Sequence, residues 1–172
     1  IHPDHCSEDT LNKLDKNIPV YIHKFHSKFL KFKIERLGFK VIELENNKNF
    51  QLSNKVKIKI IAADNCDPML CFKHIGCADL SVKNGSQQID TLCVIDDGNE
   101  VLVNVNDCPF ELAGHHIKKI RYDYDKIDIL LTGYQNASAY PQCFENLSLA
   151  QKKIGGEIAS KKCLDRALSF IK

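Results

Sequence analysis

The stretch Thr91-Leu92-Cys93-Val94-Ile95-Asp96-Asp97-Gly98-Asn99-Glu100-Val101-Leu102-Val103-Asn104-Val105 decides the fold, because it joins two apolar runs through a short polar turn. Residues 91–95 and 101–105 are rich in β-branched side chains, which favour strands. Between them, residues 96–99 supply the aspartate, glycine and asparagine that tight hairpin turns require. The sequence therefore predicts a β-hairpin in the middle of the chain.

A second strand pattern lies upstream of this hairpin, where lysines alternate with apolar residues. Lys55, Lys57 and Lys59 fall between Val56, Ile58 and Ile60. A strict alternation of this kind predicts a strand with one side in solvent. Further strands are expected at residues 19–23, 40–44, 50–52 and 127–131.

Capped and amphipathic segments predict helices on both sides of these strands. Ser7 can cap a helix that carries Glu8 and Asp9 in its first turn. Two other helices are expected at about 110–120 and 145–172, the second weakened by Gly155 and Gly156. A fourth helix is indicated by an apolar face that Gly38 terminates, namely Phe25, Phe29, Leu30, Ile34 and Leu37. Together these elements predict an α/β fold with helices packed on a largely antiparallel or mixed sheet.

The composition fits one domain that covers residues 1–172. Of the 172 residues, 44% are hydrophobic and 27% are charged, so the chain can bury a core. The 24 basic residues nearly balance the 22 acidic ones. The net charge therefore does not indicate nucleic acid or a membrane as a partner. The chain begins at Ile1 rather than Met and stops within a helical pattern, so we expect a piece of a larger protein.

The eight cysteines indicate the compartment. A chain with its own core does not need disulfides, so they are expected to be reduced thiols in the cytoplasm. A secreted disulfide framework is the alternative.

Three potential metal ligands, His2, Asp4 and His5, lie within four positions at the start of the chain. Imidazole and carboxylate groups are the usual nitrogen and oxygen ligands of zinc, iron and manganese. Pro3 stiffens the loop that carries them. The alternative is a polar loop that leads into a capped helix.

Asp107 is the next candidate ligand, because it follows the predicted strand at 101–105. Carboxylates at strand ends are aimed by a rigid sheet and are often ligands or catalytic groups. A turn formed by Asn106 and Asp107 before Pro109 is the alternative. Tyr134 and Tyr140 could line a substrate pocket, and aromatic residues that cap the core are the alternative there.

Several motifs resemble the metallo-β-lactamase superfamily. Ile1-His2-Pro3-Asp4-His5 resembles the second half of its H-x-H-x-D-H metal loop. Three further motifs are similar to the metallo-β-lactamase-like domain of CMP-N-acetylneuraminate hydroxylase and its bacterial relatives: Asp64-Asn65-Cys66-Asp67-Pro68, Asn104-Val105-Asn106-Asp107-Cys108, and residues 133–144. The resemblance covers essentially the whole chain and implies an αββα sandwich that is incomplete here.

The resemblance also implies a site with two divalent ions, zinc or iron. His2 would bind the first ion, Asp4 and His5 would hold the second, and Asp107 would bridge the two. Asp64 stands near the position where many relatives have a histidine, so the chain departs from the common hydrolase pattern there. Asp4 would also orient the attacking water.

Three functions follow as expectations. The first is a metal-dependent hydrolase that acts on a small-molecule substrate. The second is a module of a Rieske-type hydroxylase acting on an amino sugar or sugar nucleotide, which the aspartate at position 64 favours. The third is a metal-poor scaffold that retains the fold without catalysis.

Overall fold

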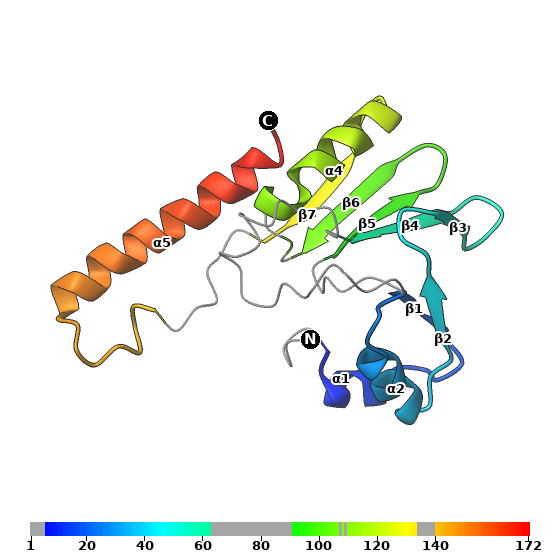
Figure 1. Cartoon of the computed structure of the whole chain (residues 1–172), viewed down its shortest axis with the longest axis horizontal. Coiled ribbons are helices and arrows are strands. Elements are labelled where there is room, and N and C mark those ends of the chain that lie inside the picture. The colour runs from blue at the N-terminus through cyan, green and yellow to red at the C-terminus, as the bar shows by residue number, and fades with distance from the viewer. Residues whose placement is uncertain (1–5, 63–90, 107, 109, 134–139) are drawn as a thin grey trace.

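The computed structural model describes residues 6–62, 91–106, 108, 110–133 and 140–172. These residues form a large sheet with one helix packed on it, a small βαβ unit, and a long helix at the end of the chain (Figure 1). Within the described residues, no helix combines the length and the apolar character needed to cross a membrane.

The large sheet has five strands in the order β3-β4-β5-β6-β7. They are β3 (Asn49–Gln51), β4 (Lys57–Ala62), β5 (Thr91–Asp96), β6 (Val101–Asn106) and β7 (Ile129–Thr132). Neighbouring strands are antiparallel except for β6 and β7, which are parallel. The sheet is therefore mixed, and its parallel pair requires a crossover connection.

The β5–β6 hairpin closes through its own polar side chains. The Gly98 N–H donates to Asp96 Oδ1 at 2.7 Å, and the N–H groups of Asn99 and Glu100 donate to Asp97 Oδ1 at 2.9 and 2.8 Å. Gly98 has φ of +89°, a left-handed conformation that glycine adopts without a Cβ penalty. The turn predicted from the sequence is confirmed.

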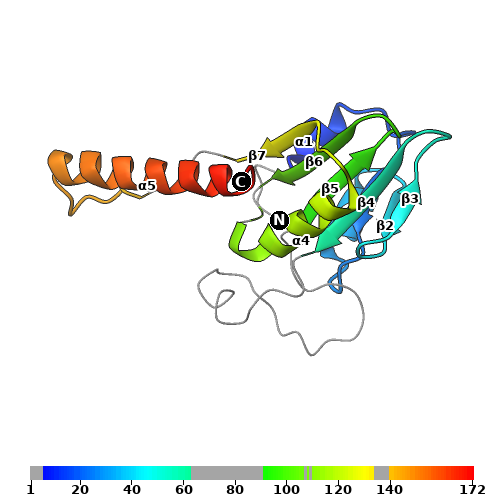
Figure 2. The same cartoon turned by 90° about the horizontal axis from the view of Figure 1, so that it is seen from above.

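The crossover between β6 and β7 is helix α4 (Phe110–Asp123), which packs across one face of the sheet (Figures 1 and 2). The main core lies between this helix and the sheet. Because Val103 and Val105 are fully buried, β6 is fixed along most of its length. The core cluster comprises Ile61, Leu92, Val94, Val101, Val103, Val105, Cys108, Ile117, Ile120 and Phe170.

The opposite face of the sheet, called the outer face below, is also apolar. Across it Ile58 pairs with Ile95, Ile95 with Leu102, and Leu102 with Ile129. Ile129 and Leu131 on strand β7 each leave 46% of their surface exposed. Burial on this face thus falls toward β7, which is an edge strand among the described residues.

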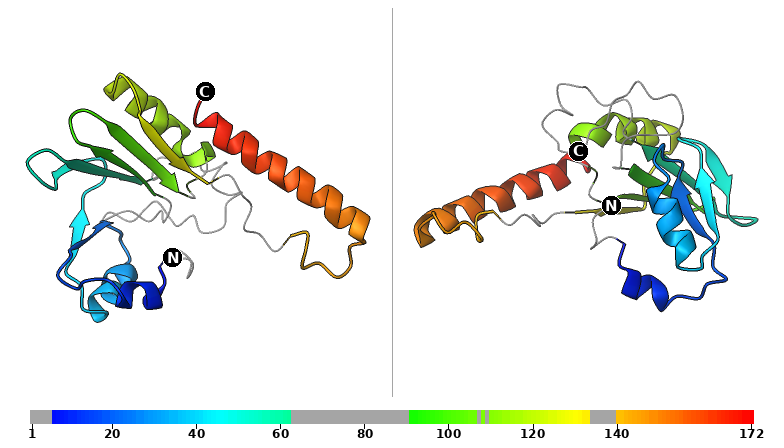
Figure 3. Two further views of the ribbon diagram at one scale, coloured as in Figure 1. Left: turned by 180° about the vertical axis from the view of Figure 1, so that it is seen from behind. Right: turned by 60° about the horizontal axis from the view of Figure 1, so that its bottom comes forward.

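The small unit consists of α1 (Glu8–Asn12), β1 (Val20–His23), α2 (Phe29–Arg36) and β2 (Val41–Leu44). β1 and β2 are parallel, and α2 connects them. The unit has its own core of Ile22, Ile34 and Phe39. It lies on the β3–β4 side of the large sheet (Figures 1 and 3), where the rings of Tyr21 and Phe50 approach to 5.4 Å between centroids.

Helix α5 (Leu149–Ser169) begins with a capping box. The Gln151 N–H donates to Ser148 Oγ, and the Ser148 N–H donates to Gln151 Oε1. The helix projects away from the sheet, with only its carboxyl end beside α4 (Figures 1 and 2). There Phe170 enters the main core, and Arg121 donates to the carbonyl of Lys172 at 2.9 Å.

The α/β class and the mixed sheet are confirmed, while two local expectations are wrong. Lys59 does not face solvent, because its side of β4 is covered by the end of α4, and it is only 9% exposed. Lys59 Nζ lies 3.9 Å from Asp123 Oδ2 and 5.9 Å from the centroid of the Tyr124 ring. The position of His23 at the junction of a predicted strand and helix predicts a surface residue, yet it is 2% exposed because β1 places it inside the fold.

Candidate functional site

Six of the seven predicted site residues lie outside the described residues. Tyr140 is the exception, and the predicted convergence of the others stays a prediction. Within the described part of the chain, no group of three or more His, Cys, Asp or Glu side chains could hold a metal ion. The residues not described are His2, Asp4, His5, Asp64, Asp107 and Tyr134.

The structure does place the strands that lead to three of these residues. Because β5 is antiparallel to both β4 and β6, those two strands run in the same direction. β7 is parallel to β6 and shares that direction. The carboxyl ends of β4, β6 and β7 therefore lie along one edge of the sheet, the edge formed by strand ends rather than by an outermost strand. From these three ends the chain continues toward Asp64, Asp107 and Tyr134, respectively.

The strand register shows that these carboxyl ends are level with one another. Ala62 at the end of β4 pairs with Thr91, and Thr132 at the end of β7 pairs with Asn106. Since Cys93 pairs with Asn104, extending the β5–β6 register by two residues brings Thr91 opposite Asn106. Adjacent strands lie about 4.8 Å apart, so the ends of β4 and β6 are separated by roughly 10 Å.

A β-bulge interrupts β6 just before Asp107. Asn104 pairs with Leu131 and Asn106 with Thr132, so β6 contains one residue more than β7 over this interval. Bulges are frequent beside active sites, where they redirect side chains, and they are rare between parallel strands. The Cys108 N–H donates to the Val105 carbonyl at 2.8 Å, which anchors the chain on the far side of Asp107.

The residues that follow the predicted His2–His5 loop are tied to α2. Ser7 caps α1 by accepting a hydrogen bond from the Thr10 N–H at 3.4 Å, as the sequence predicted. Lys33 Nζ donates to the Cys6 carbonyl at 3.4 Å, and it lies 3.6 Å from Glu8 Oε1. These contacts fix the chain immediately after His5 on the small unit.

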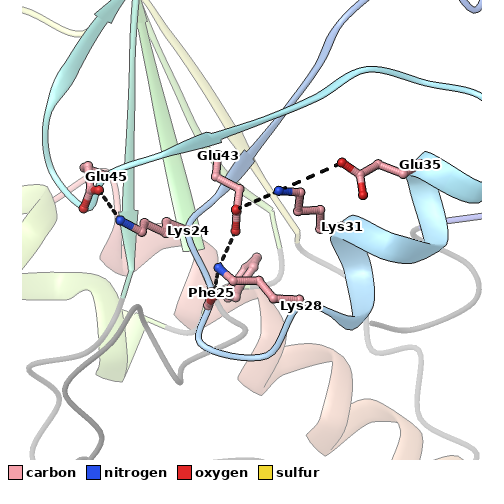
Figure 4. Close-up of polar contacts among 7 residues, drawn as sticks. All are labelled: Lys24, Phe25, Lys28, Lys31, Glu35, Glu43 and Glu45. Carbon is pink, nitrogen blue, oxygen red and sulfur yellow. Dashed lines mark hydrogen bonds and ion pairs between the residues drawn. The ribbon is translucent and has the colours of Figure 1, made fainter.

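A cluster of charged side chains joins α2 to β2 (Figure 4). Lys28 Nζ lies 2.6 Å from Glu43 Oε1 and donates to the Phe25 carbonyl, while Lys31 Nζ lies 3.4 Å from Glu43 Oε2. Partial burial alone would raise the pKa of Glu43, but the two ammonium groups hold the pKa of this carboxyl below its usual value. The basic residues along this part of the sequence predict a solvated helix face, yet Lys28 and Lys31 are counter-ions of Glu43 that join α2 to β2.

Thiol chemistry is disfavoured at Cys93, which is half-buried on the outer face of β5. Burial raises the pKa of the Cys93 thiol to about 11, so it stays protonated at neutral pH. Cys6, Cys143 and Cys163 are also free thiols. The reduced state expected of the cysteines stays a prediction.

Tyr140 stands at the turn before α5 and is partly exposed. Its ring meets Phe144 edge to face, with 5.4 Å between ring centroids. The Tyr140 hydroxyl lies over Gly155 of α5. The predicted contact with substrate remains a prediction, and the described surroundings of Tyr140 come from its own segment and α5.

Comparisons with known proteins give structural similarities at low sequence identity. No protein-family model matches the chain, and no curated protein matches it in sequence. The isothiocyanate hydrolase from Delia radicum gut bacteria is 14% identical, with a TM-score of 0.47 over 70% of this chain and 43% of that chain. A mutant of the CmlA β-hydroxylase is 12% identical, with a TM-score of 0.39 over 89% of this chain and 35% of that chain.

The strand order and the helices of the chain itself define a mixed α/β fold. The chain spans less than half the length of either of these two structures. Neither similarity assigns a role to a residue of this chain.

Proposed function

We propose that this chain is part of a metal-dependent hydrolase of the metallo-β-lactamase fold. Its ligands would be His2, Asp4, His5, Asp64 and Asp107, as the resemblance of the motifs implies. The observation that carries the proposal is the shared direction of β4, β6 and β7, whose carboxyl ends reach one edge of the sheet. Two proposed ligands and Tyr134 follow directly from that edge.

The proposed donor set fits a pair of divalent ions. Its members are three carboxylates and two imidazoles, the hard and borderline donors that zinc and iron accept. Three negative charges partly neutralise two divalent ions, so a net positive charge remains to attract an anionic substrate group. The core below the β6 end, where Val103 and Val105 are fully buried, would hold Asp107 on a rigid support.

Chemistry at such a site would divide between metal and protein. A bound divalent pair would supply Lewis acidity, which lowers the pKa of water and stabilises the oxyanion formed from an ester, amide or phosphodiester. Asp4 would accept a hydrogen bond from the attacking water and orient it. The substrate would be a small molecule positioned at the sheet edge, with Tyr134 beside it.

A second candidate is a module of a Rieske-type hydroxylase that acts on an amino sugar or sugar nucleotide. The feature that favours it is the carboxylate of Asp64, which replaces the histidine of many hydrolases in the family that the sequence resembles. A set of histidines and carboxylates with open positions is typical of non-haem iron sites. A metal-poor scaffold is the remaining alternative.

The decisive measurement is the metal content of the purified full-length protein. We expect about two divalent ions per chain, and Asp107→Ala should lower the occupancy of at least one of them sharply. The matched control is Asp125→Ala, because Asp125 is an exposed carboxylate between α4 and β7. Its metal content should equal that of the unsubstituted protein.

The same preparation separates the alternatives. Zinc together with hydrolysis of ester, amide or phosphodiester substrates would support the hydrolase. Iron with the absorption spectrum of a Rieske centre would support the hydroxylase instead. A folded protein that binds no metal would leave only the scaffold, and equal metal content in the Asp107 and Asp125 variants would exclude Asp107 as a ligand.

A further inference from the structure

Two adjacent glycines in the interior of α5 meet different surroundings. A methyl group at Gly155 would lie 2.9 Å from the Tyr140 hydroxyl oxygen and 3.2 Å from Cβ and Cγ of Pro141. At Gly156 the nearest atom would be Gln142 Nε2 at 3.7 Å, an ordinary van der Waals distance. Glycine destabilises a helix interior relative to alanine, so a close packing contact accounts for Gly155 but not for Gly156.

The segment that meets Gly155 folds back along the first turns of α5. Lys152 Nζ donates to the Gln142 carbonyl at 2.9 Å, which ties the segment to the helix. Within the segment, the Phe144 N–H donates to the Pro141 carbonyl and the Leu147 N–H to the Phe144 carbonyl, both at 3.3 Å. Pro141 is buried although it precedes a helix that is largely exposed.

The amino-terminal half of α5 has few other supports among the described residues. Leu149, Ile154 and Ile158 are all exposed, whereas burial of Ala167 and Phe170 fixes the carboxyl end. Contacts that hold the first half therefore come mainly from the folded-back segment. A helix whose apolar side chains face solvent depends on such tertiary contacts for its stability.

We infer that the missing side chain at Gly155 leaves a recess on α5 into which Tyr140 and Pro141 pack. Residues 140–147, called the strap below, and the first half of α5 therefore move as one rigid unit. The backbone of Gly155 lets the Tyr140 hydroxyl and the Pro141 ring approach the helix more closely than any side chain would allow.

The test compares Gly155→Ala with Gly156→Ala in the full-length protein by amide hydrogen exchange. Both changes add one methyl group and improve helix propensity, but only the first fills the recess. In Gly155→Ala, the amides of Phe144 and Leu147 should exchange faster by roughly tenfold or more, and chymotrypsin should cut sooner after Phe144. In Gly156→Ala, both readouts should match the parent protein.

Two further variants keep the inference testable if Gly155→Ala does not fold. Lys152→Met removes the bond to the Gln142 carbonyl without entering the recess, and it should speed exchange in the strap while amides near Ala167 stay unchanged. Tyr140→Phe removes the atom nearest to Gly155 and should partly restore protection to Gly155→Ala. Equal strap exchange in the two alanine variants, or an unchanged strap in Lys152→Met, would overturn the inference.

Discussion

Cys93 shows how the environment of a single residue limits its chemistry. It lies on β5 opposite Ile60 and Asn104, and burial raises its thiol pKa to about 11. Only the thiolate reacts readily with electrophiles or binds metal ions. Cys143, by contrast, is exposed in the strap before α5.

We therefore expect Cys143 to react with iodoacetamide at pH 8 while Cys93 remains unmodified. At that pH roughly one Cys93 thiol in a thousand is ionised, and the folded sheet also limits access to it. Mass spectrometry of the native protein after partial alkylation measures both sites. Alkylation of Cys93 at a rate like that of Cys143 would contradict the burial described here.

Local residue preferences were readable from the sequence, whereas burial was not always readable. Ser7, Gly38 and Gly98 take the capping and turn roles that their side chains or φ angles favour. His23 and Lys59 were misplaced because their burial depends on neighbours distant in sequence, such as Asp123 beside Lys59. The local pattern contains no information about such neighbours.

At the scale of elements, Asp128 joins the start of β7 to the start of β6. Its Oδ2 accepts a hydrogen bond from the Val101 N–H at 2.8 Å, and its own N–H donates to the Val101 carbonyl at 2.9 Å. Lys126 Nζ lies 2.5 Å from Asp128 Oδ1. The bond from Lys126 and the one from the Val101 N–H hold the pKa of the Asp128 carboxyl below its usual value.

This pKa direction predicts how stability depends on pH. Because the folded pKa of Asp128 is depressed, its contribution is present above the unfolded pKa of about 3.9 and is lost as pH falls through the folded pKa. Asp128→Asn should therefore lower the free energy of unfolding near pH 6, with a gap to the parent that narrows below about pH 4. Urea unfolding at several pH values measures it, and a gap that does not change with pH would exclude the ionised carboxylate as the cause.

Element positions were predicted well wherever the chain is periodic or capped. The β5–β6 hairpin, the α4 crossover and the α5 helix all lie close to their expected ranges. Strand order and the bulge in β6 were not predicted, because pairing between distant strands leaves no local signature. The shared edge of β4, β6 and β7 therefore came from the structure, although the ligand candidates beside it came from sequence motifs.

At the scale of the whole molecule, the outer face of the sheet is open near β7. Ile129 and Leu131 are apolar and half exposed on β7, an edge strand in the described part of the chain that carries no charged residue among its four positions. Natural edge strands usually carry charges or proline, which discourage pairing with other chains. Ile154 and Ile158 of α5 are exposed as well.

We expect the isolated chain to bind a hydrophobic dye and to self-associate through this surface. Replacing both Ile129 and Leu131 with lysine should reduce dye fluorescence and association, and it should change stability by no more than about 1 kcal/mol because both side chains are already half exposed. Fluorescence titration and light scattering test this. A double variant that unfolds would show that these side chains belong to the core.

The connection between β4 and β5 has a consequence for the order of folding. The β5–β6 hairpin pairs segments that are close in sequence, and in the β6–α4–β7 unit a local helix spans most of the connection, so little loop entropy opposes either pairing. β4 pairs with β5 across 28 intervening residues, 63–90, and such non-local pairing slows folding. The strand that leads toward Asp64 is thus expected to dock late, onto a sheet in which β5, β6 and β7 are already paired.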